Sequence, residues 1–176
     1  MASGKIRLWE TVLFALLGAF MFASKQVLEF LPNVHMLGML TVLYTRLFSV
    51  KALIPVYIFV LLEGIYAGFN VWWVPYLYIW AVLWGAAMLI PERLKPLPKS
   101  LCLIAVCSLH GFLYGTLYAP FQAFAFGLDF KGMVAWIIAG LPYDAIHGFS
   151  NLFMGMLIYP LYIPMKRATD KFYNMK

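Results

Sequence analysis

Ionisable and amide side chains occur inside segments of this sequence that are otherwise apolar. Glu63 and Asn70 are seven residues apart, and Asp144, His147 and Asn151 follow one another at spacings of three and four. On a helix, each of these two sets lies along one face. Because charges and amides are costly inside an apolar segment, such side chains are candidates for ligand binding or for buried ion pairs. Glu63, in the middle of its segment, is the first candidate.

Aromatic side chains accompany these polar residues, and Gln122 extends the same set. The members are Trp72, Trp73, Tyr76, Trp80, Tyr118, Gln122 and Tyr143. Aromatic faces bind flat rings and cations, so that together with the two carboxylates they favour a neutral or cationic heterocycle over an anion. Large neutral ligands also fit aromatic walls. Tryptophan and tyrosine are equally common at membrane interfaces, an alternative that applies above all to Trp72, Trp73 and Tyr76.

Two of the polar candidates have structural alternatives. Asp144 closely follows Pro142 and could cap the start of its own helix. His110 could bond a helix carbonyl inside the bundle. A membrane-embedded enzyme acting on a lipid or quinone could use His110, Asp144 and His147 as acid, base or metal ligands. The sequence lacks HExxH, Walker and GxSxG motifs, so we expect no catalytic site and no metal site.

The elements that carry these residues are predicted to be membrane-spanning helices. The sequence is 64% hydrophobic and only 11% charged, whereas a soluble domain is about 25% charged. Crossing about 30 Å of hydrocarbon takes about 20 helical residues. We therefore predict an all-α integral membrane protein, with a single domain over residues 1–176 that forms one bundle of six transmembrane helices. The predicted spans are 8–29, 34–49, 51–69, 76–91, 100–121 and 141–164, with a short amphipathic surface helix within 121–140.

The distribution of cations predicts the orientation of the bundle. If both termini lie on one side, eleven of the 13 Lys and Arg residues share that side, and only Lys25 and Lys131 lie opposite. Cytoplasmic loops are rich in Lys and Arg, so both termini are predicted to be cytoplasmic. The net charge of +6 then reflects topology and attraction to anionic lipid, and no nucleic-acid partner is expected.

Small residues recur on the first predicted helix. Ala15, Ala19 and Ala23 are four residues apart, a spacing that places them along one stripe. In lipid, small side chains let helix backbones approach closely and pack. The spacing alone fits either a seam inside the bundle or a surface for another membrane protein.

Three features together resemble a known family. They are the AxxxAxxxA pattern in the first of six helices, the segment EFLPNVHMLGMLTVLY after it, and the segment GLPYDAIHGFSN near the end. This combination is similar to the substrate-binding S component of energy-coupling factor (ECF) vitamin transporters. The resemblance implies that Ala15, Ala19 and Ala23 dock on a transmembrane coupling subunit, which two cytoplasmic ATPases drive.

The polar and aromatic stripes predict a ligand pocket in the outer halves of the third to sixth spans, with EFLPNVH as a lid. The resemblance implies that the ligand is a vitamin or vitamin precursor and that the chain lies in a prokaryotic plasma membrane. It would hold no cofactor itself, because the partner subunits use the ATP. Two alternatives remain: a scaffold or assembly subunit whose alanine stripe only binds another helix, and the lipid or quinone enzyme described above.

Overall fold

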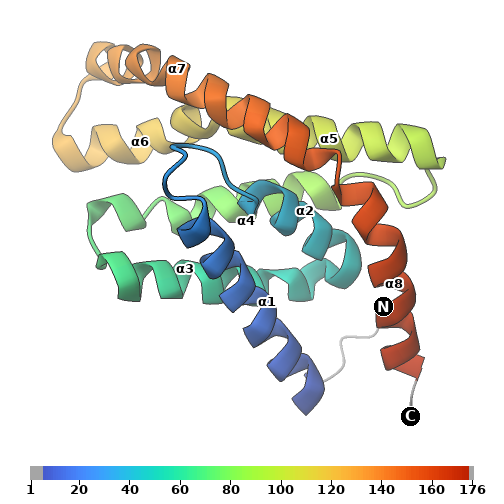
Figure 1. Cartoon of the computed structure of the whole chain (residues 1–176). Coiled ribbons are helices and arrows are strands. Elements are labelled where there is room, and N and C mark those ends of the chain that lie inside the picture. The colour runs from blue at the N-terminus through green and yellow to red at the C-terminus, as the bar shows by residue number, and fades with distance from the viewer. Residues whose placement is uncertain (1–5, 175–176) are drawn as a thin grey trace.

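The structure, a computed structural model, describes residues 6–174, and this range is helical apart from its connections (Figure 1). It contains eight α-helices and two short 3-10 helices, η1 and η2. In chain order they are α1 (Leu8–Val27), α2 (Leu37–Phe48), η1 (Ser49–Ala52), α3 (Leu53–Ala67), η2 (Val71–Trp73), α4 (Tyr76–Met88), α5 (Pro96–Phe112), α6 (Tyr114–Phe126), α7 (Phe130–Gly155) and α8 (Ile158–Asn174).

Several of the helical runs match the dimensions of a bilayer. Four are long and apolar enough to cross it: Leu8–Val27, Leu37–Ala67, Val71–Met88 and Pro96–Phe126. A fifth is added if Phe130–Gly155 and Ile158–Tyr173, which are bent by 48° relative to each other, count as one span. The prediction of an all-α, multi-pass membrane protein is therefore confirmed, with four to five candidate spans.

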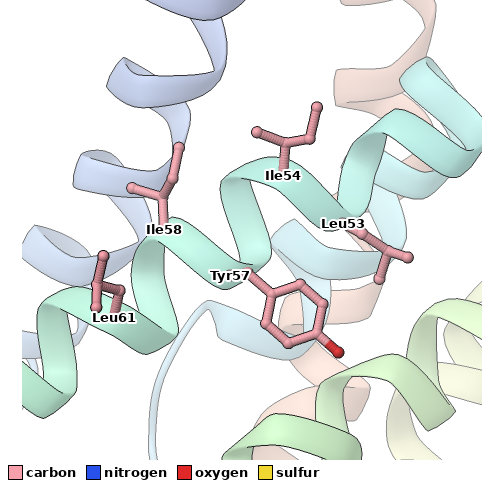
Figure 2. Close-up of a pocket in the computed structure, with 5 residues that line it drawn as sticks. All are labelled: Leu53, Ile54, Tyr57, Ile58 and Leu61. Carbon is pink, nitrogen blue, oxygen red and sulfur yellow. The ribbon is translucent and has the colours of Figure 1, made fainter.

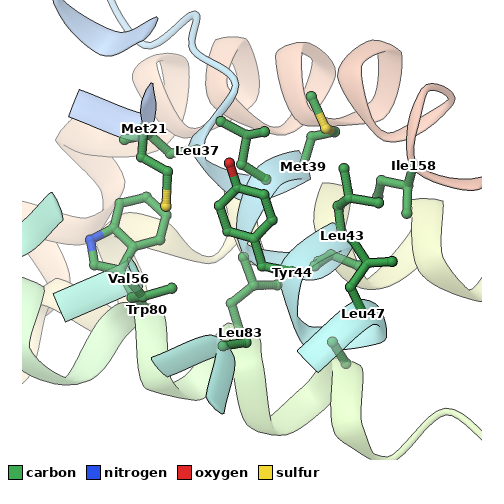
Figure 3. Packing of buried hydrophobic residues seen from close by; sticks show 14 of the residues in the cluster. Met21, Leu37, Met39, Leu43, Tyr44, Leu47, Val56, Trp80, Leu83 and Ile158 are labelled. Carbon is green, nitrogen blue, oxygen red and sulfur yellow. The ribbon is translucent and has the colours of Figure 1, made fainter. Parts of the chain in front are cut away.

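The short helix α2 lies at the centre of the molecule. All 12 of its residues are buried, and at 1.5 Å per residue it is only about 18 Å long. It packs against α4 and α8, where Tyr44 and Leu43 belong to the same apolar cluster as Trp80, Leu83 and Ile158 (Figure 3). The predicted span 34–49 thus exists as a helix, but its neighbours are other helices on all sides.

The chain reverses direction after α2. Ser49 has a positive φ of 54°, and the following turn places Lys51 within hydrogen-bond distance of Glu10 at the start of α1. Near the other end of α1, Lys25 pairs with Glu63 of α3. Helices α1 and α3 therefore run side by side in the same direction, while α2 runs against them. Gly18 faces α3 so closely that a Cβ there would collide with Ile58.

The last third of the chain departs from the predicted boundaries. Helix α6 ends at Gly127, whose φ of 64° is the left-handed conformation that commonly closes a helix. Asp129 then caps α7 by accepting a 2.7 Å hydrogen bond from the backbone N–H of Gly132. Helix α7 continues through Pro142 to Gly155. The predicted surface helix within 121–140 and the predicted helix start at 141 are therefore wrong.

Pro142 misled the boundary prediction because proline inside a helix is usually disruptive. Here Pro142 is exposed on the side of α7 that faces away from the bundle, and membrane helices tolerate proline in this way. The actual bend follows Gly155, where α8 leaves at 48°. The predicted fifth span, 100–121, corresponds to α5 and α6, which break only at Leu113.

The first and last parts of the chain that the structure describes meet at one end of the bundle. Glu10 is fully buried and accepts hydrogen bonds from the backbone N–H of Arg7 at 2.8 Å, from Lys51 Nζ at 2.6 Å and from the Tyr173 hydroxyl at 2.5 Å. Trp9 packs against the ring of Tyr173 with centroids 5.0 Å apart. We call this the termini end, and the opposite end, which carries residues 28–36 between α1 and α2, the loop end (Figure 1).

Candidate functional site

A cavity of about 180 Å³ lies beneath residues 28–36 at the loop end. Its lining comes from α1, from this loop, and from one residue each of α4, α6 and α7. The lining residues are Lys25, Leu28, Glu29, Leu31, Pro32, Asn33, Val34, His35, Tyr76, Tyr114 and His147. The EFLPNVH segment that was predicted as a lid therefore contributes most of the cavity's cover.

Rings from four elements meet around this cavity. His35 extends from the loop against His147 of α7, with ring centroids 4.6 Å apart, and against Trp80 of α4 at 6.2 Å. Tyr114 of α6 contacts His147 at 4.8 Å. Tyr76 meets Trp80 edge to face at 5.8 Å. The loop is thus anchored by one imidazole inserted among the rings of α4, α6 and α7.

Several polar atoms around the cavity are buried without a hydrogen-bond partner in the described part of the chain. They are Gln26 Oε1, His35 Nδ1, Trp80 Nε1, His110 Nδ1 and His147 Nε2. A buried polar atom without a partner costs about 1–3 kcal/mol, and most such atoms in proteins are satisfied. Thr41 Oγ1, Arg46 Nε, Ser150 Oγ and Asn151 Oδ1 also lack partners within residues 6–174. Of all these atoms, only the ring nitrogens of His35 and His147 belong to residues that line the cavity, and these two are the candidates for contact with a ligand.

The hydrogen bond of His110 fixes its tautomer. Its Nε2 lies 3.1 Å from the carbonyl oxygen of Ile79, and because a carbonyl only accepts, Nε2 carries the proton. In the neutral ring, Nδ1 is then an acceptor. The expectation that His110 bonds a helix carbonyl is confirmed for one nitrogen, while the other faces no partner.

Glu63 has an ion-pair partner that the sequence did not suggest. Its side chain is fully buried, forms a salt bridge with Lys25, and accepts a 3.1 Å hydrogen bond from Gln26 Nε2. Of the two roles predicted for Glu63, ligand or buried ion pair, the structure contains the ion pair. Its negative charge is therefore neutralised inside the protein.

Asp144 acts on a neighbouring helix. Its two carboxylate oxygens accept hydrogen bonds of 2.9 and 3.1 Å from the backbone N–H of Gly115. Gly115 lies in the first turn of α6, just after the break at Leu113, where N–H groups lack helical partners. Asp144 itself lies inside α7, so the alternative that it caps its own helix is wrong. Asp144 therefore stabilises the start of α6. Its carboxylate lies so close to Gly115 that a Cβ at this position would collide with it.

The loop histidine is held in its neutral form. Burial lowers the pKa of His35 from 6.5 to about 4; a hydrogen bond with the backbone opposes this shift, and the positive charge of Lys25 adds to it. At neutral pH, His35 therefore presents one N–H donor and one acceptor nitrogen.

Three of the predicted site residues surround the cavity, namely Tyr76, Trp80 and His147. Tyr118 lies one layer further out, stacked on Trp136 at 5.8 Å, and its hydroxyl donates a 2.8 Å bond to the Trp72 carbonyl. Trp72 itself meets the edge of Tyr76. The ligand-binding roles of these residues stay predictions, but their positions are compatible with them.

Other predicted site residues lie away from the cavity lining. Asn70 and Tyr143 are exposed, and Gln122 is half-buried outside the lining. Trp73 Nε1 donates a 2.7 Å bond to the carbonyl of Val60, and Asn151 Nδ2 donates one of 3.2 Å to that of Cys107. The bonds of the last two residues join helices, as structural side chains do.

Sequence reasoning placed Tyr114 among the outer aromatic side chains of the fifth span, but it missed Lys25 and His35 as members of the site. Lys25 had one detectable signal, since it is one of two cations predicted on its side of the membrane. His35 belongs to the predicted lid, but nothing in its spacing indicates that its ring turns inward. Tyr114 is at the helix break at Leu113, which no residue pattern marks.

The alanine stripe faces away from the bundle. Ala15, Ala19 and Ala23 are exposed, while the opposite side of α1 buries Phe14 and Gly18 against the core. The stripe is therefore not a seam between helices of this chain. Its free position leaves lipid or another protein as its neighbour.

A larger depression occurs on α3, but it lacks polar groups for specific binding. It measures about 430 Å³, is open, and is lined by Leu53, Ile54, Tyr57, Ile58 and Leu61 (Figure 2). The Tyr57 hydroxyl is already bonded to the Leu77 carbonyl at 2.8 Å. Within residues 6–174, no group of three or more His, Cys, Asp or Glu side chains could hold a metal ion.

The cavity at the loop end and the exposed alanine stripe of α1 are therefore the two candidate functional surfaces. Comparison of the chain with protein-family models, with curated proteins and with solved structures gives no match. Its helices make it a multi-pass membrane protein.

Proposed function

We propose that this chain is the substrate-binding S component of an ECF-type vitamin importer. It captures a small micronutrient in the cavity at the loop end without converting it. The observation that carries this proposal is a cavity whose lining includes two histidines, His35 and His147, each with an unpartnered buried nitrogen, because such atoms are costly in a membrane protein unless a ligand satisfies them.

The chain has four to five candidate spans. One of them, Leu37–Ala67, consists of α2 and α3, which run in opposite directions, so that counting these two helices separately gives the six crossings of the proposal, with α2 as a short one. Arg46, Glu92 and Lys99 form a charged cluster at the termini end, beside the pair of Glu10 and Lys51. With the termini cytoplasmic, the cavity opens toward the outside, where an importer must bind its cargo.

The exposed stripe of α1 provides the second half of the proposal. Because Ala15, Ala19 and Ala23 leave a flat strip of backbone free, a coupling subunit can pack closely against α1. This chain then binds no ATP, and two cytoplasmic ATPases of the complex supply the energy. The protein resides in a prokaryotic plasma membrane.

The capture function is tested by purifying the full chain without added vitamins and identifying co-eluting small molecules by mass spectrometry. A stoichiometric micronutrient is the expected result. A chain that retains no small molecule and binds none from a vitamin panel contradicts capture and favours a scaffold. Release of a chemically altered lipid or quinone instead supports an enzyme.

The docking half is tested with Ala19→Trp in the reconstituted complex. We expect uptake to be lost while ligand binding by the isolated chain is unchanged, because the indole fills the stripe and is remote from the cavity. Phe20→Trp is the matched control, since Phe20 is also exposed on α1 but lies off the stripe. Equal uptake by the two variants rules out the stripe as the docking surface.

A further inference from the structure

We propose that the cavity at the loop end takes an uncharged, single-ring heterocycle that both donates and accepts hydrogen bonds. This inference rests on the proposed capture function and names the class of its ligand. The sequence favoured a neutral or cationic heterocycle. The structure separates these two because it places a cation, Lys25, in the cavity lining.

The buried carboxylate next to the cavity already has its counter-charge. Glu63 is paired with Lys25 and accepts a hydrogen bond from Gln26, whereas Asp144 is outside the cavity lining and accepts the backbone N–H of Gly115 with both oxygens. An anionic ligand would have to draw Lys25 away and leave Glu63 buried without a counter-charge, which is strongly unfavourable. A cationic ligand would stand beside Lys25 and compete with it for the same carboxylate. An uncharged ligand disturbs neither pair.

One further charged side chain lines the cavity, and it does not alter this balance. Glu29 belongs to the loop and is exposed to solvent at the rim. An exposed carboxylate is screened by water and contributes little to an ion pair. Selection between charged and uncharged ligands therefore depends on the buried groups.

The unpartnered atoms require a ligand with both donors and acceptors. In the lining itself, His35 and His147 each have one unpartnered ring nitrogen. Trp80 and His110 lie behind the lining. Trp80 Nε1 can only donate, and Figure 3 shows it turned away from Tyr44 and Leu43 of the apolar core, while His110 Nδ1 accepts, as its bond to Ile79 dictates. A ring nitrogen or carbonyl together with an amino, amide or hydroxyl group matches this set.

The size and walls of the cavity restrict the ligand to one ring. Its 180 Å³ is about six times the ~30 Å³ that a water molecule occupies in the liquid, and less than the roughly 300–1,000 Å³ of sites for drug-sized ligands. Tyr76 and Tyr114 supply aromatic walls from α4 and α6. Such walls favour a flat ring, stacked or edge-on.

The ligand class is tested with matched probes on the full chain in nanodiscs. Nicotinamide, nicotinate and the ring-methylated nicotinamide cation share one ring but are neutral, anionic and cationic, and uracil with orotate forms a second neutral and anionic set. Isothermal titration should give the neutral member of each set a dissociation constant at least about tenfold below its charged relatives. A charged member that binds most tightly, or no measurable binding of either neutral ring at millimolar concentration, overturns the ligand class.

Variants identify the groups responsible. His147→Phe and, independently, His35→Phe should each weaken the neutral probe by about tenfold or more, while Tyr143→Phe, whose side chain is exposed, should leave it unchanged. Thermal unfolding of each variant identifies any that fails to fold, and two histidines on different elements keep the test decisive. Unchanged affinity in both folded histidine variants contradicts the inference.

The double variant Lys25→Met with Glu63→Gln addresses the charge argument. It should reduce the difference in dissociation constant between the neutral probe and its charged relatives to less than about tenfold, because a charged ligand then no longer disrupts or competes with the ion pair. The two proposals fail separately: a charged vitamin that co-elutes with the natural chain overturns the ligand class and leaves capture intact. A chain that retains and binds no small molecule overturns both.

Discussion

The two ends of the bundle differ in how completely their buried polar groups are paired. At the termini end, Glu10 has three hydrogen-bond donors, and Arg46 Nη1 donates to the carbonyls of Ala87 and Ile90 at 3.0 Å each while Nη2 pairs with Glu92, so that only Nε of this guanidinium lacks a partner in the described part of the chain. At the loop end, ring nitrogens of four aromatic side chains around one cavity have no partner within the described residues.

On the proposed function, this difference separates side chains that stabilise the fold from side chains that contact a ligand. A satisfied buried charge stabilises its own neighbours, and its removal leaves an uncompensated partner. An unsatisfied buried nitrogen only costs free energy until something binds to it. Burial alone, which is equally high at both ends, does not distinguish the two kinds of site.

Removing the buried carboxylate at the termini end should lower the free energy of unfolding more than any other change. Glu10→Ala removes the acceptor shared by Arg7, Lys51 and Tyr173, and we expect a loss of about 2–4 kcal/mol in the free energy of unfolding. The half-exposed ammonium of Lys51 keeps the loss below that of a fully buried pair. Denaturant unfolding in micelles measures it. Asp170→Ala breaks an exposed ion pair at the same end. An equal loss of unfolding free energy in this variant would contradict a special role for the buried Glu10.

At the loop end we expect a substitution to change ligand affinity and to leave stability nearly unchanged. His147→Phe removes an unsatisfied nitrogen, so the free energy of unfolding should change by less than about 1 kcal/mol in either direction. Ligand affinity is the quantity that should fall. The same denaturant series checks stability, and a loss comparable to that of Glu10→Ala would show that His147 is structural.

The protonation of His35 gives the loop end a characteristic pH dependence. Its pKa is about 4 in the folded protein and 6.5 without the fold, so between these values the unfolded chain binds more protons. Stability from the neutral ring is therefore complete above pH 6.5 and is lost as the pH falls toward 4. Thermal midpoints across this window should fall less steeply in His35→Gln. If the thermal midpoints of the natural chain and of His35→Gln fall with the same slope, protonation of His35 does not contribute to the pH dependence of stability.

The smallest combined effect on stability and ligand affinity is expected at Asp129, which is exposed and already accepts a hydrogen bond. Asp129→Ala removes the cap of α7 and should cost about 1 kcal/mol. Ligand affinity should not change, because Asp129 is outside the cavity lining. Titration of the neutral probe checks this, and a weaker affinity would mean that the start of α7 shapes the cavity.

The sequence predicted elements well where local signals determine them. Apolar runs separated by prolines located α1 to α4, and the spacing of three small residues identified a stripe that the structure leaves exposed. The prediction failed where a local signal is overridden: Pro142 reads as a boundary, yet it is tolerated on the exposed side of α7.

The site was only partly predictable because its key contacts are long-range. Lys25 and Glu63 are 38 residues apart in sequence, and Asp144 reaches Gly115 over 29. Periodicity shows which residues share a face of one helix, but it does not show which helix that face meets. Tyr76, Trp80 and His147 were identified because their types alone are unusual in apolar spans, whereas His35 needed the path of the loop.

Helix α1 connects the two surfaces on which the proposal depends. The alanine stripe ends at Ala23, and Lys25 and Gln26 follow at once, bound to Glu63 beside the cavity and continuous with the loop above it. If a partner on the stripe shifts this helix, it changes the affinity for ligand by some factor. Thermodynamic linkage requires that the ligand then change the affinity for the partner by the same factor. The change in ligand affinity caused by the partner and the change in partner affinity caused by the ligand would then measure the same coupling free energy.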